Sequence, residues 1–357
     1  MSASRFIRPD DPAWAKALAS CKHDLYHLPA YAEVEGNWIG AEPIAFLYEC
    51  DGQTMMLPLL ERPTPAGVGT DAVTPYGYSP PVFSSSATED FIAGALLSFQ
   101  DTARDRGMVS TFIRLHPLLC SSLPSAQSNS ELQWTEVERG STVALPLEDE
   151  PEQWLKQVTK GHRLDIRKLE RSGCKVVVNS DAAWAAFPGI YRATMERIGA
   201  SPSYFYSDEY LREFRSRLGP RVHCAAVFDC EHEPLCASLF TNVGGLLQYH
   251  LSGTRANAAR QAPTKLLLAH MRQWARENGV RYFHLGGGYG GGEDTLFQFK
   301  RRFGGAPLPF RTVSIVHDQE KFDAECAVWR SKTDEPLAGP AGFFPPYRAP
   351  VIANVEK

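Results

Sequence analysis

Two halves of this chain carry the same order of predicted elements, and this repetition constrains the fold more than any other feature of the sequence. Each half has a hairpin pattern with a cysteine just before the turn, Cys50 in one half and Cys230 in the other. A helix pattern with a charged end then stops at a glycine, Gly107 or Gly279, and an aromatic strand pattern follows. Because the order recurs at similar spacing, the sequence predicts a duplicated α/β unit.

The individual elements follow from turn and periodicity signals. The first half predicts a hairpin that turns at Asp51-Gly52, a helix from Phe91 to Gly107, a strand ended by Pro117 and a closing strand over 141–147. The second half predicts a helix over 150–176, three strands over 221–254, a helix over 262–279 and a strand over 280–285. We therefore expect an N-terminal lobe over 1–147, a C-terminal lobe over 148–335 and a Pro/Gly-rich tail over 336–357.

Composition narrows the class of protein. A chain of 357 residues suggests two domains at about 150 residues each, and 43% hydrophobic with 22% charged residues is ordinary for globular proteins. The longest apolar stretch, Phe91 to Phe99, is too short to span a membrane, and we expect no secretory signal. Eight cysteines without CxxC pairs predict reduced thiols in the cytoplasm, with neither disulfides nor a zinc site. A net charge of −4 excludes a general nucleic-acid binder but leaves room for a local basic patch.

One such patch is predicted over 160–175, a segment that contains six Lys or Arg residues and two acidic residues. Arg163, Arg167 and Arg171 recur at helical spacing and share one face. That face is either a solvated surface or a contact for phosphates, for which the guanidinium fork is well suited.

Three further segments could line a binding site. Arg197 precedes an aromatic run, Tyr204 to Tyr206, which is either core or the lining of a polar ligand pocket. The segment 248–265 reads as strand, loop and helix start, an arrangement that binds anions. Six glycines surround Tyr289, but no βαβ unit follows, so we expect close backbone approach or motion there and no dinucleotide site.

The motifs that remain together resemble a known family. They are GHRLDIRKLERSGCKV, YHLSG, PTKLLLAHMRQWARENG, RYFHLGG and FQFKRRFGG in the second half, with TPYGYSPPVF and FIRLHP in the first. Their order, over residues 20–330, resembles the Fem-like branch of the GNAT-fold acyltransferase superfamily. The resemblance implies an α/β (α+β) fold of two tandem GNAT-like lobes, with mixed, mostly antiparallel sheets flanked by helices and the active site in the C-terminal lobe.

The resemblance also implies an activity, namely transfer of an aminoacyl group from an aminoacyl-tRNA to an amine of a small peptide or natural-product intermediate. The tRNA is a co-substrate, and neither cofactor nor metal is expected. Lys300, preceded by Phe299, falls at the catalytic centre. The implied substrate-binding residues are Arg197, Tyr204, Tyr206, Tyr249, His250, Tyr76 and Tyr78, with His250 a candidate base. The implied contacts to tRNA phosphates are Arg163, Arg167, Arg171, Arg255, Arg301 and Arg302.

Two departures from the family pattern bear on the donor and the acceptor. The segment ARQAPTK has alanine and proline where the GNAT pyrophosphate loop has glycines, which disfavours acyl-CoA as the donor. Glu33 and Glu35 stand where cell-wall members carry a lysine, which favours a cationic acceptor over a phosphate-bearing one. Two alternatives stay open: an acyl-CoA-dependent N-acyltransferase and a non-catalytic double-GNAT module.

Overall fold

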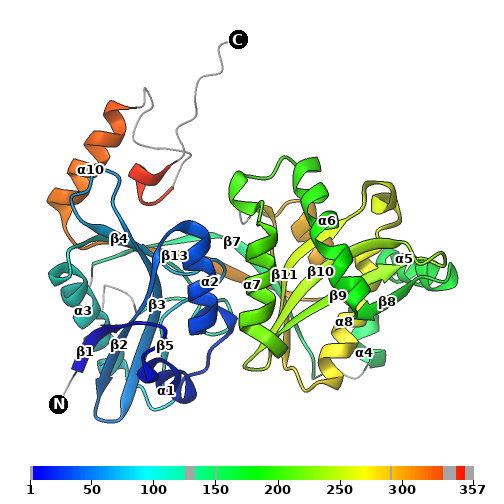
Figure 1. The fold of residues 1–357 in the computed structure, drawn as a ribbon. Coiled ribbons are helices and arrows are strands. Elements are labelled where there is room, and N and C mark those ends of the chain that lie inside the picture. The colour runs from blue at the N-terminus through cyan, green and yellow to red at the C-terminus, as the bar shows by residue number, and fades with distance from the viewer. Residues whose placement is uncertain (1–2, 125–132, 149–150, 290–291, 333–342, 350–357) are drawn as a thin grey trace. The chain divides into compact units, whose positions relative to one another are not determined.

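A computed structural model describes residues 3–124, 133–148, 151–289, 292–332 and 343–349. The chain divides into two compact units, each built on a sheet (Figure 1). Unit 1 comprises Met1–Glu138 and Arg311–Lys357, and unit 2 comprises Arg139–Phe310.

The sheet of unit 1 has the strand order β1-β2-β3-β4-β6-β13. Its strands are β1 (Ala3–Ile7), β2 (Glu42–Cys50), β3 (Gln53–Pro63), β4 (Thr70–Val73), β6 (Met108–Arg114) and β13 (Ala306–Val316), with a short β5 (Val82–Phe83) beside β3. Among the described strand pairs of unit 1, β4 with β6 is the only parallel one. The helices are α1 (Pro12–Ser20), α2 (Pro29–Ile39), α3 (Glu89–Asp105) and α10 (Gln319–Ser331).

The sheet of unit 2 repeats this plan as β8-β9-β10-β11-β12-β7. Its strands are β8 (Lys175–Val178), β9 (Val222–Phe228), β10 (Pro234–Val243), β11 (Leu246–Thr254), β12 (Tyr282–Gly287) and β7 (Thr135–Pro146). The single parallel pair, β11 with β12, occupies the same position as β4 with β6. The helices are α4 (Pro151–Gln157), α5 (Lys160–Arg171), α6 (Asp181–Arg197), α7 (Asp208–Leu218), α8 (Thr264–Glu277) and α9 (Thr295–Arg301). The predicted duplication of an α/β unit is confirmed by this strand-by-strand match.

Local signals account for the repeated elements. Asp51 and Gly52 adopt positive φ angles of 48° and 77°, which the tight turn between β2 and β3 requires. Thr88 caps the N-terminus of α3, and the amide of Gly107 bonds to the carbonyl of Arg104 just past its end. The predicted helix over 150–176 is two helices, because α4 ends at Gln157 and α5 begins at Lys160, and the end of the segment belongs to β8.

The strand that pairs with β6 and the strand that pairs with β12 each come from outside the half of the sequence that supplies the other strands of that unit. β7 follows β6 along the chain but pairs with β12, whereas β13 follows α9 and pairs with β6. The compact units therefore divide the chain differently from the predicted lobes, with 139–147 in unit 2 and 311–335 in unit 1. Of the predicted tail, 343–349 packs on unit 1 through buried Tyr347, and its other residues lie outside those described.

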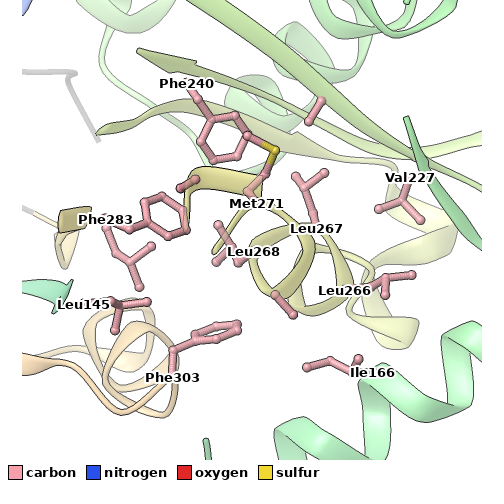
Figure 2. Packing of buried hydrophobic residues seen from close by; sticks show 14 of the residues in the cluster. Leu145, Ile166, Val227, Phe240, Leu266, Leu267, Leu268, Met271, Phe283 and Phe303 are labelled. Carbon is pink, nitrogen blue, oxygen red and sulfur yellow. The ribbon is translucent and has the colours of Figure 1, made fainter. Parts of the chain in front are cut away.

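The core of unit 2 holds α8 against the sheet (Figure 2). Leu267 and Met271 of α8 are fully buried beside Phe240 of β10 and Phe283 of β12. Burial of each such side chain is worth about 1.5–3 kcal/mol. The packing of α8 thus holds β10 and β12 in place from this face of the sheet.

Candidate functional site in unit 2

The parallel strands β11 and β12 pair over only part of their length. Backbone pairing joins Leu246–Gln248 to Tyr282–His284, yet β11 continues to Thr254 and β12 to Gly287. In unit 1 the equivalent strand β4 pairs with β6 along its whole length. Crevices at the carboxyl ends of parallel strands are common ligand sites. The opening between β11 and β12 therefore distinguishes unit 2 from unit 1.

A bulge in each strand starts this divergence. On β11, Leu251 pairs with Leu239 and Tyr249 pairs with Phe240, so that His250 is an extra residue. On β12 the pairing with β7 shifts between His284 and Gly286 in the same way. Because a bulge bends its strand, the two strands separate just beyond the last residues that they pair.

Lys300 of α9 lies in this opening. Its Nζ donates a hydrogen bond of 2.6 Å to the carbonyl of Gly287 on β12 and lies 5.7 Å from the ring centroid of Tyr249 on β11. The side chain is buried, and this burial lowers the pKa of Lys300 from 10.5 to about 8, against the opposing influence of Asp294. Lys300 thus carries a positive charge at neutral pH and loses it at a lower pH than an exposed lysine does.

Asp294 orients α9 and the glycine-rich loop before it. One carboxylate oxygen accepts the amide N–H of Phe297 at 2.8 Å as the helix N-cap, and the other accepts that of Tyr289 at 2.7 Å. A Cβ on Gly288 would lie 2.1 Å from the carbonyl oxygen of Gly292, so this turn requires glycine. The predicted close backbone approach is confirmed here. Residues 290–291 of the loop lie outside those described.

Phe299, predicted beside Lys300 at the catalytic centre, packs toward α5. Its ring lies 5.3 Å from that of His162 and 5.6 Å from that of Phe303, and its carbonyl lies 3.1 Å from His162 Nε2. These contacts anchor α9 to α5. A direct part for Phe299 in the reaction stays a prediction.

Tyr249 and His250, predicted together, lie on opposite faces of the sheet. Tyr249 packs against the α8 core, where burial raises its pKa to about 12 despite hydrogen bonds to Ser252 and Ser238. His250 instead stacks its ring on Phe214 of α7, 5.1 Å away. His250 thus lies on the α7 side of the sheet, and its predicted part as a base stays a prediction.

The predicted acceptor segment approaches the end of β11. Arg197 is exposed, and its guanidinium donates to the carbonyl of Thr254 at 2.8 Å. The carbonyl of Tyr204 accepts the Tyr191 hydroxyl at 2.9 Å. Tyr206 is 5% exposed and stacks on Tyr210 at 4.2 Å, so the core interpretation of this side chain holds.

The predicted phosphate contacts divide into engaged and exposed groups. Arg163 donates to the last carbonyls of α4, including that of Val158, and Arg255 pairs with Glu233 at 2.9 Å. Exposed side chains on α5 and at the end of α9 make up the other group, which is Arg167, Arg171, Arg301 and Arg302. Arg163 therefore serves as a helix cap, and the exposed arginines stay predicted RNA contacts.

Tyr76 and Tyr78 belong to a loop of unit 1. The carbonyl of Tyr76 accepts the Tyr31 hydroxyl at 2.7 Å, and the ring of Tyr78 lies 5.8 Å from those of Tyr26 and His116. Their predicted role in binding substrate stays a prediction.

The loop before α8 keeps a left-handed turn without glycine. Ala262 has a φ of 53° and accepts the amide of Lys265 at 3.0 Å. This conformation costs a non-glycine residue about 1–2 kcal/mol. The segment ARQAPTK thus has the positive φ for which glycine is usually selected, although it retains the alanine Cβ.

Three residues of the site were not predicted from the sequence. Asp294 was detectable as a capping residue before a helix pattern. Gln248 and His284, which meet where the strands diverge, carry no motif and become visible only from the register of β11 and β12. Among the described residues, no three His, Cys, Asp or Glu side chains gather as a metal ion would need, and no helix is long and apolar enough to cross a membrane.

Comparisons with known proteins agree with this architecture. Residues 156–301 match a family model described as an acetyltransferase (GNAT) domain. The crystal structure of FemX is similar over 90% of this chain and 99% of that chain, with a TM-score of 0.71 at 14% identity. L-PGS from Bacillus licheniformis covers 89% of this chain and 94% of its own (TM-score 0.55, 12% identity).

A tandem GNAT protein from the clavulanic acid biosynthesis pathway covers 89% of this chain and 99% of its own (TM-score 0.52, 9% identity). A comparison with curated protein sequences finds no match. At these identities the likeness concerns the fold, and it confirms the predicted fold class of two tandem GNAT-like units.

Proposed function

This chain has a Fem-like tandem GNAT fold with a GNAT domain in unit 2, and from that premise we propose that it transfers an aminoacyl group from aminoacyl-tRNA to an amine acceptor. The observation that carries the proposal is Lys300, a buried cation held between the diverging strands β11 and β12. An aminoacyl ester is already activated, so the enzyme has to orient the amine and stabilise negative charge on the carbonyl oxygen.

The reaction needs no covalent intermediate with the protein. The neutral amine attacks the ester carbonyl, a C–N bond forms, and the C–O bond to the terminal ribose breaks. The nitrogen loses one proton and the departing ribose oxygen gains one. The Lys300 ammonium lies where it can counter the charge that develops on the carbonyl or the ribose oxygen. Water or a group on the substrate takes the proton, since His250 lies on the opposite face of the sheet.

Other predicted residues fit around this centre. Exposed Arg167 and Arg171 on α5, with Arg301 and Arg302 at the end of α9, would hold backbone phosphates of the acceptor stem. Arg197 of α6, near the end of β11, would bind the acceptor substrate together with Tyr204. The similar structures FemX and L-PGS support aminoacyl transfer as the reaction. A third similar structure, described as the C-terminal domain of a putative lysylphosphatidylglycerol synthetase, supports it as well.

One observation favours acyl-CoA as a second candidate donor. The left-handed turn at Ala262 precedes the N-terminus of α8, where unpaired amide groups favour an anion such as a pyrophosphate. The alanine Cβ restricts the approach of that group, so aminoacyl-tRNA remains the proposed donor.

A comparison of donors tests the proposal. The full-length protein is incubated with a panel of amines and one of three donors: charged tRNA, charged tRNA pretreated with RNase, or acyl-CoA. We expect an amide product from charged tRNA that RNase pretreatment abolishes. A product that survives RNase treatment and requires acyl-CoA would replace the first proposal with the second.

A further inference from the structure

A buried polar pair lies at the point where β11 and β12 diverge. Oε1 of Gln248 and Nδ1 of His284 are 2.7 Å apart, and the two side chains are 1% and 0% exposed. The same two residues form the last backbone pair of the parallel strands. A side-chain hydrogen bond thus joins the strands exactly where their backbone ladder stops.

The bulges begin directly beyond this pair. His250 is the extra residue two positions after Gln248, and the shift on β12 falls immediately after His284. A bulge bends its strand, and among the described residues no parallel backbone pair of β11 with β12 follows Gln248 and His284. Gln248 and His284 therefore hold the strands together at the apex of the opening, which we call the clasp.

Lys300 joins the same two strands farther into the opening. Its Nζ bonds to Gly287, three residues past His284, and lies over the ring of Tyr249, the residue after Gln248. A change in strand separation at the clasp would change both contacts. The distance between β11 and β12 at the clasp thus bears on where the Lys300 ammonium lies.

The clasp itself lies on the other face of the sheet. Tyr249 and Phe283 pack on the α8 core, and side chains alternate between faces along a strand, which directs Gln248 and His284 away from that core. The backbone of α6 approaches this second face, since a Cβ on Gly253 would lie 2.7 Å from the carbonyl oxygen of Ile190. The pair acts through the strands and not by touching Lys300.

We infer that Gln248 and His284 are positioning residues, whose hydrogen bond sets the separation of β11 and β12 and thereby places Lys300 between Gly287 and Tyr249. The consequence for catalysis rests on the proposed function, whereas the placement of Lys300 does not. The titratable groups beside Lys300 are Asp294, from the loop before α9, and Tyr249 of β11, whose ring centroid lies 5.7 Å from Nζ.

Reactivity of the Lys300 amine measures this placement without any substrate. The full-length protein is treated with trace acetic anhydride across a pH series, and acetylation of Lys300 is followed by mass spectrometry. In the wild type the midpoint is expected at about 8, because burial lowers the pKa of Lys300 from 10.5. Gln248→Met has a similar volume but no acceptor, so it loosens the clasp, admits water and raises the midpoint by about one pH unit.

Three variants complete the test. His284→Asn keeps an N–H near the Nδ1 position and is expected to leave the midpoint within about 0.3 unit of the wild type. Gln248→Asn shortens the side chain by one methylene and is expected to shift the midpoint upward, as Gln248→Met does. It is the milder change and replaces Gln248→Met in the test if the Met variant does not fold. Cys224→Ala, in the same sheet on β9, controls for loosened packing and should leave the midpoint unchanged.

An unchanged midpoint in a folded Gln248→Met or Gln248→Asn protein overturns the inference. An equal shift in Cys224→Ala does so too, because the effect would then reflect general packing. In an assay with charged tRNA, Gln248→Met should lower kcat at least tenfold with KM for tRNA within about twofold, and should shift the pH profile. Labelling needs no donor, so a wrong donor assignment does not affect the labelling result. Conversely, an unchanged midpoint in the clasp variants would not contradict the proposal of aminoacyl transfer.

Discussion

Lys300 is the residue on which the account depends, and its environment couples function to stability. The folded protein lowers the pKa of Lys300 from 10.5 to about 8 by burial, so the unfolded chain binds a proton more tightly than the native one. Stability associated with Lys300 is therefore lowest below pH 8 and rises as the pH increases from about 8 to 10.5. The full difference corresponds to about 3 kcal/mol.

This linkage gives a first prediction. The free energy of unfolding of the wild type should increase between pH 7 and pH 9.5 relative to that of Lys300→Met, which has no titrating group at this position. Denaturant unfolding of both proteins at the two pH values measures the difference. Parallel changes in the two proteins would show that Lys300 has an ordinary pKa in the folded state.

The exposed arginines of α5 give a second prediction at the residue scale. If Arg167 and Arg171 contact phosphates, the double variant Arg167→Ala/Arg171→Ala should weaken tRNA binding and reduce the slope of log affinity against log salt by about 2. The double variant Arg330→Ala/Lys332→Ala, at the C-terminal end of α10 in unit 1, also removes two exposed positive charges and serves as the charge-matched control. A slope identical to that of the wild type would leave these arginines as a solvated face.

At the scale of elements, α9 depends on its N-cap. Asp294→Ala removes the acceptor of both Phe297 and Tyr289 and should cost about 1 kcal/mol of stability. Because α9 carries Lys300, we also expect turnover to fall at least tenfold, as measured by aminoacyl transfer. Asp318→Ala removes the equivalent cap of α10, where Asp318 accepts the amide of Lys321 at 3.0 Å. That control should lose similar stability with activity unchanged, and equal activity in both variants would contradict a role for the cap.

The sequence predicted local elements well and their non-local pairing poorly. The turn at Asp51-Gly52 and the helix end at Gly107 follow from backbone conformations that only nearby residues determine. The break between α4 and α5 was missed, because the helix pattern continues across Val158 while Arg163 caps the first helix from the second. The bulge at His250 depends on the register between β10 and β11, which periodicity along one strand does not reveal.

For the whole molecule, the exchanged strands decide where the chain can be divided. A fragment over 148–335 lacks β7, so it leaves β12 as an edge strand beside Lys300. A fragment over 139–310 retains the part of β7, Thr142–Pro146, that pairs with β12. We expect the second fragment to show a cooperative unfolding transition and the first to be markedly less stable, as followed by circular dichroism during denaturation. Equal stability of the two fragments would mean that β7 contributes little to unit 2.

The duplicated architecture was predictable from the repeated order of elements, whereas the exchange of β7 and β13 was not. β7 comes directly after the strands of unit 1 in the sequence, and β13 comes directly after the elements of unit 2. No local signal in the sequence marks that β7 pairs with β12 and β13 with β6. The location of the site in the second copy could be inferred from the resemblance of its motifs. Its physical basis, the opening that β11 and β12 form and β4 and β6 do not, required the register of both pairs.

The most direct test of the account is the rate of amide formation from charged tRNA by the wild type and by Lys300→Met, with Lys16→Met as a matched control on exposed α1 surface. We expect the wild type to form an amide product that RNase treatment of the charged tRNA abolishes. The rate in Lys300→Met should be about 10²–10³-fold lower, as for loss of one preorganised donor. The rate in the control should be unchanged. Wild-type turnover in a correctly folded Lys300→Met protein would contradict the account.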